Sequence, residues 1–217
     1  MQFLSTHEYK KALKNIQNSQ KTSYFGLILL ENGEYQKACD FFKKQKNYYS
    51  EGFCHLLQGN LKKAREIWYQ APESPAISWG KTILGIINYK LEAIPSFLQI
   101  RNFLEMTLHY LLNSPQRELA YRLIEAKEFL ADCNIETYKY IGRVLAYHDM
   151  EELAVEYLEK AISEIPQDYE AIFVLAELYL KNNDIKKAIK YLEQTLYVNK
   201  YHTPAMRILK ELKSKSY

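Results

Sequence analysis

Hydrophobic positions in the second half of the chain recur with a helical period and then repeat as a block. Two stretches, 151–162 and 185–196, carry Ala154, Tyr157 and Leu158 and then the same residue types 34 positions later, at 188, 191 and 192. Each is preceded by a stripe at i, i+3, i+4 and i+7, formed by Tyr138, Ile141, Gly142 and Leu145, and then by Ile172, Leu175, Ala176 and Tyr179. This spacing predicts two amphipathic helices in each block.

Small residues mark the points where these helices are expected to cross. Gly142 and Ala176 hold equivalent places in the first helix of each block, and Ala154 and Ala188 do so in the second. A large side chain would hold two packed helices apart, so the pattern predicts antiparallel hairpins in close contact. The same contact face recurs in each block because a single hairpin cannot bury both of its faces alone.

Weaker copies of the hairpin extend toward the N-terminus. One covers 101–134, with Ala120 at the place of Ala154. Two more, within 19–71, repeat at an offset of only 26 residues, which predicts shorter helices or tighter turns; their matched pairs are Gly26 and Gly52, Gly33 and Gly59, Ala38 and Ala64, and Phe42 and Trp68. A fainter copy follows at 78–98, with Gly80 in its first helix and Ala93 in its second.

The repeated markers resemble the tetratricopeptide repeat, which pairs two helices at a period of about 34 residues. The resemblance is carried by Gly142, Leu145, Ala154, Leu158, Ala161 and Pro166, and then by Leu175, Ala176, Tyr179, Ala188 and Leu192. It implies an all-α fold of antiparallel helix hairpins stacked as an α-solenoid, a right-handed superhelix. The segment 203–217 is similar to the single polar helix that caps such arrays.

Composition suits this fold. Gly and Pro number 7 and 6 in 217 residues, and helix breakers at that level agree with a mainly helical chain. The stretch 96–114 is apolar on nearly all sides, which predicts a helix buried between neighbours. We expect a divergent N-terminal region, 1–95, that opens with an amphipathic helix, and regular repeats with a capping helix over 96–217. With no Gly/Ser linker between them, the two regions are expected to form one continuous array.

The charge distribution and the motifs of the sequence reduce the number of function classes to consider. The net charge of +3 is spread without a basic stripe, so we expect no nucleic-acid partner. We expect no membrane span, because the most apolar stretch is short and contains Arg101 and Glu105. Phosphate-loop, dinucleotide, nucleophile-elbow and zinc-helix motifs are missing from the sequence, so the prediction is a protein that is not an enzyme, with no cofactor and no metal. The three cysteines are read as small buried residues of a reducing compartment.

The family resemblance implies a concave groove lined by the first helix of each hairpin. By register, the partner-binding residues are expected to be Asn102, Glu105 and His109, then Lys139, Tyr140 and Arg143, then Phe173, Val174 and Glu177, with Arg207 from the cap. Aromatic residues beside charged ones favour contact with a peptide or a helix. Family members that grip a C-terminal carboxylate use a set of Lys, Asn and Arg, and here Glu105, Phe173 and Glu177 interrupt that set.

The prediction is therefore a cytoplasmic, non-catalytic scaffold that binds a peptide segment or helix of another protein in its groove. The alternative is a chaperone or assembly factor of a secretion or cell-envelope machine. Self-association through Trp68, Trp79 or the apolar 96–113 helix stays open, and so do the partner's identity and any hinge in the middle of the chain.

Overall fold

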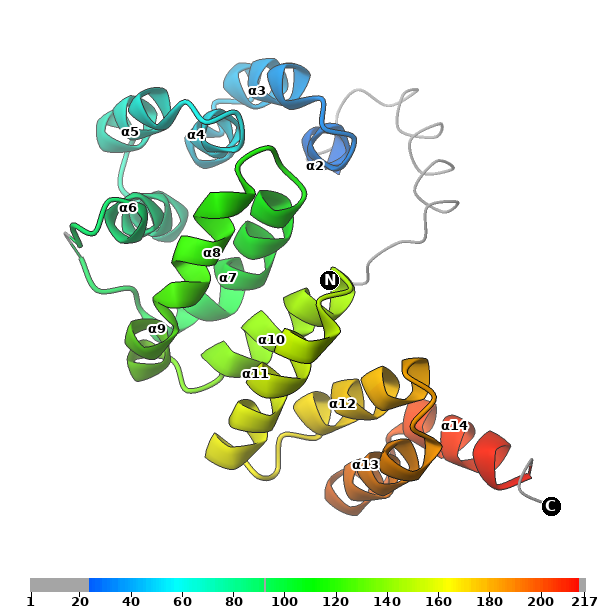
Figure 1. Ribbon diagram of the computed structural model, residues 1–217. Coiled ribbons are helices and arrows are strands. Elements are labelled where there is room, and N and C mark those ends of the chain that lie inside the picture. The colour runs from blue at the N-terminus through cyan, green and yellow to red at the C-terminus, as the bar shows by residue number, and fades with distance from the viewer. Residues whose placement is uncertain (1–23, 92, 215–217) are drawn as a thin grey trace. The chain divides into compact units, whose positions relative to one another are not determined.

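The computed structural model describes residues 24–91 and 93–214, and these residues form helices with no strand. The predicted N-terminal helix lies outside the described residues. The helices are α2 (Tyr24–Glu31), α3 (Tyr35–Lys44), α4 (Tyr48–Leu57), α5 (Leu61–Gln70), α6 (Pro75–Ile87), α7 (Phe97–Leu112), α8 (Arg117–Glu125), α9 (Lys127–Cys133), α10 (Thr137–Tyr147), α11 (Glu151–Glu164), α12 (Tyr169–Lys181), α13 (Ile185–Val198) and α14 (Thr203–Ser214). Figure 1 shows their order. The predicted all-α fold of helix hairpins is confirmed.

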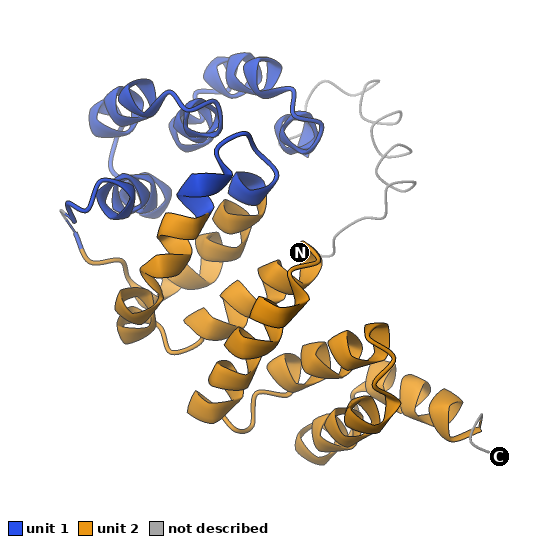
Figure 2. Cartoon of the chain, in the orientation of Figure 1, with its two compact units in different colours: residues 1–93, 110–120 blue, residues 94–109, 121–217 orange. Residues whose placement is uncertain are grey.

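The chain divides into two compact units, coloured separately in Figure 2. Unit 1 contains residues 1–93 and 110–120, and unit 2 contains residues 94–109 and 121–217. The long apolar helix α7 therefore belongs to unit 2 over most of its length and to unit 1 at its C-terminal end. Residues 107–112 of α7 are all buried, whereas Phe97 and Leu98 are exposed, so the prediction of a helix buried on nearly all sides is confirmed for its C-terminal half only.

Local chemistry sets where the helices begin and end. The side chains of Asn47, Asn60, Ser74, Asp168 and Asp184 each accept a hydrogen bond from a backbone N–H in the first turn of α4, α5, α6, α12 and α13. The tight turns inside the hairpins need a left-handed residue. Gly33 supplies it with φ 71° and Gly59 with φ 80°, whereas Asp149 and Asn183 occupy the equivalent places in unit 2.

Glycines facing aromatic rings hold the hairpins of unit 1 together. A Cβ atom added to Gly26 would lie 2.2 Å from Phe42, and one added to Gly52 would lie 2.3 Å from Trp68. Gly80, from the next helix, meets the same Trp68, so this indole is enclosed by two glycine faces and is fully buried. In each of these two hairpins, therefore, the glycine that the offset of 26 had matched contacts the matched aromatic residue of the same hairpin, Gly26 with Phe42 and Gly52 with Trp68.

The short period of unit 1 follows from short helices. Helices α3, α4 and α5 have 10 residues each, whereas α11 and α13 of unit 2 have 14. The faint copy at 78–98 is only half right. Its first helix exists as α6, but the segment around Ala93 is not helical, and α7 follows directly. Tyr89, in a left-handed conformation with φ 54°, ends α6, and Pro95 lies between the two helices.

Unit 2 contains the regular repeats. Helix α10 packs on α11, α12 packs on α13, and α11 and α13 each pack against the following helix. Gly142 faces Leu158, where an added Cβ atom would lie 2.8 Å from Cγ, so the small residue permits the predicted close crossing. At the C-terminal end Ala205 of α14 completes a buried cluster with Ala176 and Leu192, and Ile208, Leu209 and Leu212 pack against it. Helix α14 thus covers the apolar end of the last hairpin.

Candidate interaction surface

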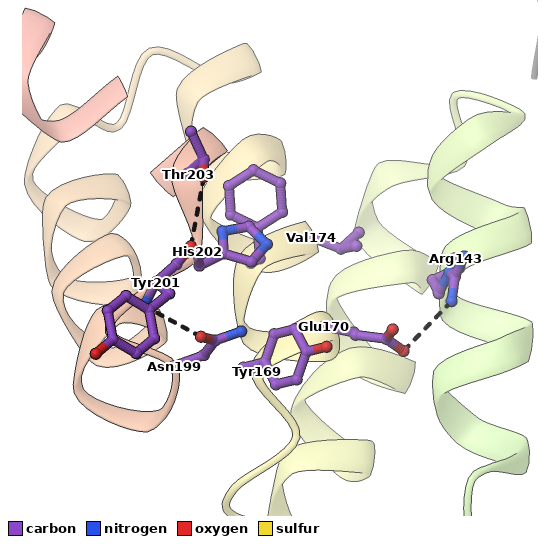
Figure 3. A pocket seen from close by; sticks show the side chains of 9 residues that line it. Arg143, Tyr169, Glu170, Val174, Asn199, Tyr201, His202 and Thr203 are labelled. Atoms are coloured by element: carbon purple, nitrogen blue, oxygen red, sulfur yellow. Dashed lines mark hydrogen bonds and ion pairs between the residues drawn. The ribbon is translucent and has the colours of Figure 1, made fainter. Parts of the chain in front are cut away.

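A pocket of about 400 Å³ opens on unit 2 where α10, α12 and the α13–α14 connection meet. Figure 3 shows the side chains around it. The lining residues are Arg143, Tyr169, Glu170, Phe173, Val174, Asn199, Tyr201, His202 and Thr203. Four of them carry aromatic rings and two carry opposite charges, so the pocket offers apolar area beside a polar edge.

His202 organises the aromatic wall. Its ring lies 4.4 Å from the ring of Phe173 and 5.8 Å from that of Tyr169, measured between centroids. Its Nδ1 accepts a hydrogen bond of 3.2 Å from the backbone N–H of Ala205, in the first turn of α14. His202 therefore caps this helix, and the bond assigns the accepting tautomer at Nδ1. The same residue closes the pocket and starts the capping helix.

The connection between α13 and α14 is held by its own hydrogen bonds. The Asn199 side chain accepts from the backbone N–H of Tyr201 at 3.2 Å, and the Thr203 hydroxyl donates to the Tyr201 carbonyl at 3.4 Å. The ring of Tyr201 nevertheless stays 75% exposed. A fixed backbone that presents a large exposed ring suits a binding surface, because little freedom is left to lose on contact.

Arg143 and two carboxylates form the polar edge. Its Nε lies 3.2 Å from Glu105 Oε1 on α7, and its Nη1 lies 3.6 Å from Glu170 Oε2 on α12. Burial raises the pKa of Glu105, and the Arg143 guanidinium opposes that shift. The Arg143 side chain is 35% exposed and that of Glu170 is 46% exposed, so both reach solvent at the mouth of the pocket.

Lys139 lies deeper than the sequence predicted. Its Nζ contacts Glu136 at 2.7 Å, Asp168 at 2.9 Å and Glu170 at 3.2 Å, and its side chain is only 5% exposed. Burial alone would lower the pKa of Lys139, but hydrogen bonds to Glu136 and Asp168 outweigh it and raise the pKa well above 10.5. Since Asp168 also caps α12, this cluster joins α10 to the start of α12.

Tyr140 belongs to the same cluster. Its hydroxyl donates to Glu136 Oε2 at 2.7 Å, and its side chain is buried. Burial and the bond to Glu136 raise the pKa of Tyr140. For Glu136, burial is opposed by the bonds from Lys139 and Tyr140, and the pKa falls below its usual 4.5. Lys139 and Tyr140 are thus buried residues whose polar contacts hold the helices that carry the pocket, and they are not themselves part of the binding surface.

The other predicted residues are dispersed. Asn102, Glu177 and Arg207 are exposed and lie outside the pocket lining. His109 is buried, and its Nδ1 lies 3.1 Å from Nε2 of His148, at the end of α10. Of the ten predicted residues, the pocket brings together Arg143, Phe173 and Val174.

Register along the first helices could not reveal the remaining lining residues. Asn199, Tyr201 and His202 come from the α13–α14 connection and Thr203 from the first position of α14, whereas the expected groove contained only residues from within helices. A signal was present in the stretch Tyr201–Pro204, where an aromatic residue and a histidine precede a proline at a helix start. Tyr169 and Glu170 were missed because they lie in the first turn of α12, just before the apolar stripe.

Metal binding and membrane insertion are the two other properties to consider for the described residues. No group of three or more His, Cys, Asp or Glu side chains there has an arrangement that could hold a metal ion. In the same part of the chain, no helix has the length and apolar character needed to cross a membrane. Cys39 and Cys54 are buried thiols in unit 1, as the sequence predicted, whereas Cys133 is partly exposed.

The fold and this surface define a class: an all-α protein of stacked helix hairpins with a capping helix. Within that class, residues 151–212 match the family model described as tetratricopeptide repeat. The matched range covers α11 to α14 and confirms the resemblance drawn from the 34-residue period.

Among solved structures, the chain is similar to YrrB, which is described as a tetratricopeptide repeat protein with an unusual peptide-binding site. The two share 16% identity over 93% of this chain and 97% of the other, with a TM-score of 0.39. A comparison with curated proteins gives no match.

Proposed function

We propose that unit 2 is a non-catalytic protein-interaction module and that its pocket holds a segment of a partner protein. The observation that carries this proposal is the pocket itself, where Tyr169, Phe173, Tyr201 and His202 surround a solvent-open space of about 400 Å³. That volume suits one or two bulky side chains rather than a folded domain. Rings of this kind, at the centre of a surface, are the usual anchors of protein contacts.

The supporting geometry favours a preformed site. Three sets of interactions hold the residues around the pocket in place. They are the hydrogen bond between His202 and the first turn of α14, the hydrogen bonds within 199–203, and the ion pairs of Lys139 at the start of α12. A segment that docks there meets rings already in place, so binding orders mainly the segment. The match of residues 151–212 to the tetratricopeptide repeat model is in line with this proposal, since stacked helical repeats form extended binding surfaces.

Two exposed tyrosines give a matched test. Tyr201 lines the pocket and is 75% exposed, whereas Tyr197, on α13, is 90% exposed and lies outside the lining. Neither removal opens the core, so Tyr201→Ala and Tyr197→Ala should both keep the wild-type melting temperature. Peptides would be selected on the full chain from a random display library, and their Kd measured by isothermal titration.

We expect Tyr201→Ala to weaken the selected peptides by about tenfold or more and Tyr197→Ala to leave Kd within about twofold. Phe173→Ala should act as Tyr201→Ala does, once its own stability is checked, because Phe173 also packs on the buried cluster. A library that yields no specific peptide, or peptides that ignore both pocket substitutions, would remove the proposal.

A further inference from the structure

Arg143 and Glu170 line the pocket, and they belong to a larger charged cluster beside it that contains more negative than positive groups. Two cations, Lys139 and Arg143, lie among four carboxylates, those of Glu105, Glu136, Asp168 and Glu170. Lys139 is enclosed by three of them and is almost inaccessible, and Arg143 contacts the other carboxylate, Glu105, together with Glu170. An incoming anion would therefore meet cations that are already paired, with carboxylates around them.

An incoming cation meets a different environment. Glu170 Oε2 already contacts Lys139 and Arg143, at 3.2 and 3.6 Å, but the side chain is 46% exposed and the cluster around it has an excess of carboxylates. Figure 3 shows its carboxylate between Tyr169 and Arg143. The rings of Tyr169, Phe173 and Tyr201 line the same space. Aromatic faces attract cations, and a carboxylate beside them adds a directed partner. The long aliphatic stem of lysine or arginine fits the apolar wall, and its charge reaches the edge.

We infer that the pocket selects a partner segment that inserts a lysine or arginine side chain, with its stem against the aromatic wall and its charge beside Glu170. This rests on the proposed function and names the chemistry of the ligand. This preference is the opposite of that of family members that bind a C-terminal carboxylate, because the cations that would bind an acidic terminus are here already paired with carboxylates of the same chain.

The test uses a random peptide library selected on the full chain and then a substitution cycle. Each selected peptide would be made with its basic residue replaced by norleucine, which keeps the apolar stem and removes the charge. The protein variants are Glu170→Gln and, as a matched control, Glu152→Gln on the exposed part of α11. Lys139 keeps two carboxylate partners in Glu170→Gln, so that variant should melt close to wild type.

We expect enrichment of lysine or arginine, and a loss of about tenfold in affinity for the basic peptide in Glu170→Gln. The norleucine peptide should bind wild type and Glu170→Gln within about twofold, and Glu152→Gln should bind both peptides like wild type. Binding of the basic peptide should weaken as salt rises.

Peptides that depend on Tyr201 but carry no basic residue, or that bind equally after norleucine replacement, would overturn this inference and leave the proposed function standing. Enrichment of acidic peptides would do the same. Selected peptides that ignore Tyr201→Ala would overturn both.

Discussion

Lys139 Nζ lies 2.9 Å from Asp168 Oδ2, and both side chains are more than nine-tenths buried. The contact joins a residue of α10 to the residue that caps α12, and the two residues are 29 positions apart in the sequence. Because α12 presents Tyr169, Glu170, Phe173 and Val174 to the pocket, this ion pair sets where the aromatic wall lies. The surface of the repeat therefore depends on a polar cluster beneath it.

Removal of the lysine should destabilise the fold strongly. Lys139→Met keeps the aliphatic volume but leaves Glu136 and Asp168 without their cation in a buried place. We expect the free energy of unfolding to fall by about 3 kcal/mol or more, measured by urea denaturation. Lys213→Met removes an ion pair that also joins two helices, through Glu193 at 2.8 Å, but one exposed on both sides. That control should lose less than about 1 kcal/mol, and equal losses in the two variants would contradict the account.

The same cluster predicts a pH dependence. The pKa of Glu136 is below 4.5 in the fold, so its contribution is present above pH 4.5 and is lost as pH falls through the folded value. The pKa of Lys139 is raised above 10.5, so its contribution is present below pH 10.5 and is lost only as pH rises through a still higher value. The difference in urea midpoint between wild type and Lys139→Met should therefore be largest between these limits and should shrink as pH falls below 4.5. A difference that grows as the solution is acidified would contradict this.

The sequence predicted the helices well and the surface less well, for physical reasons. A helix face that must pack against a neighbour constrains residue size at fixed spacing, so Gly142, Ala154, Ala176 and Ala188 report the hairpins directly. Burial of a charged residue leaves no such periodic mark. Lys139 occupies a position that the helix register assigns to the groove. Its burial is explained by three carboxylate partners, one at the start of α10 and two at the start of α12.

Trp68 offers a test of the glycine contacts in unit 1. In Gly52→Ala the new Cβ atom would lie 2.3 Å from Trp68 Nε1, and Nε1 is held by a 3.1 Å bond to the Tyr49 carbonyl. Although alanine favours a helix, the overlap should cost about 1–3 kcal/mol of unfolding free energy. Trp68→Phe makes room, so Gly52→Ala added to that variant should cost less than it does in wild type, as a double-mutant cycle would show. Strictly additive losses would argue against the contact.

Two substitutions of His202 can distinguish its effect on the stability of the capping helix from its effect on the affinity of the pocket for a peptide. His202→Asn retains a side chain that can accept from the Ala205 N–H, whereas His202→Ala does not. We expect His202→Ala to lower the stability of α14 by about 1 kcal/mol, seen as faster hydrogen exchange over 203–214, and His202→Asn to lower it much less. Both lose the ring that packs on Phe173, so both should weaken peptide binding. Wild-type affinity in His202→Asn would mean that the ring takes no part in the wall.

The most direct test of the central claim is to map where a library-selected peptide lies on the full chain. Amide chemical shifts of the ¹⁵N-labelled protein would be followed during titration with that peptide. The account predicts that the largest changes cluster at Tyr169–Val174 and Asn199–Thr203, with a further change near Arg143. Changes confined to α2–α5, or to the exposed side of α11 and α13, would place binding elsewhere and contradict the account.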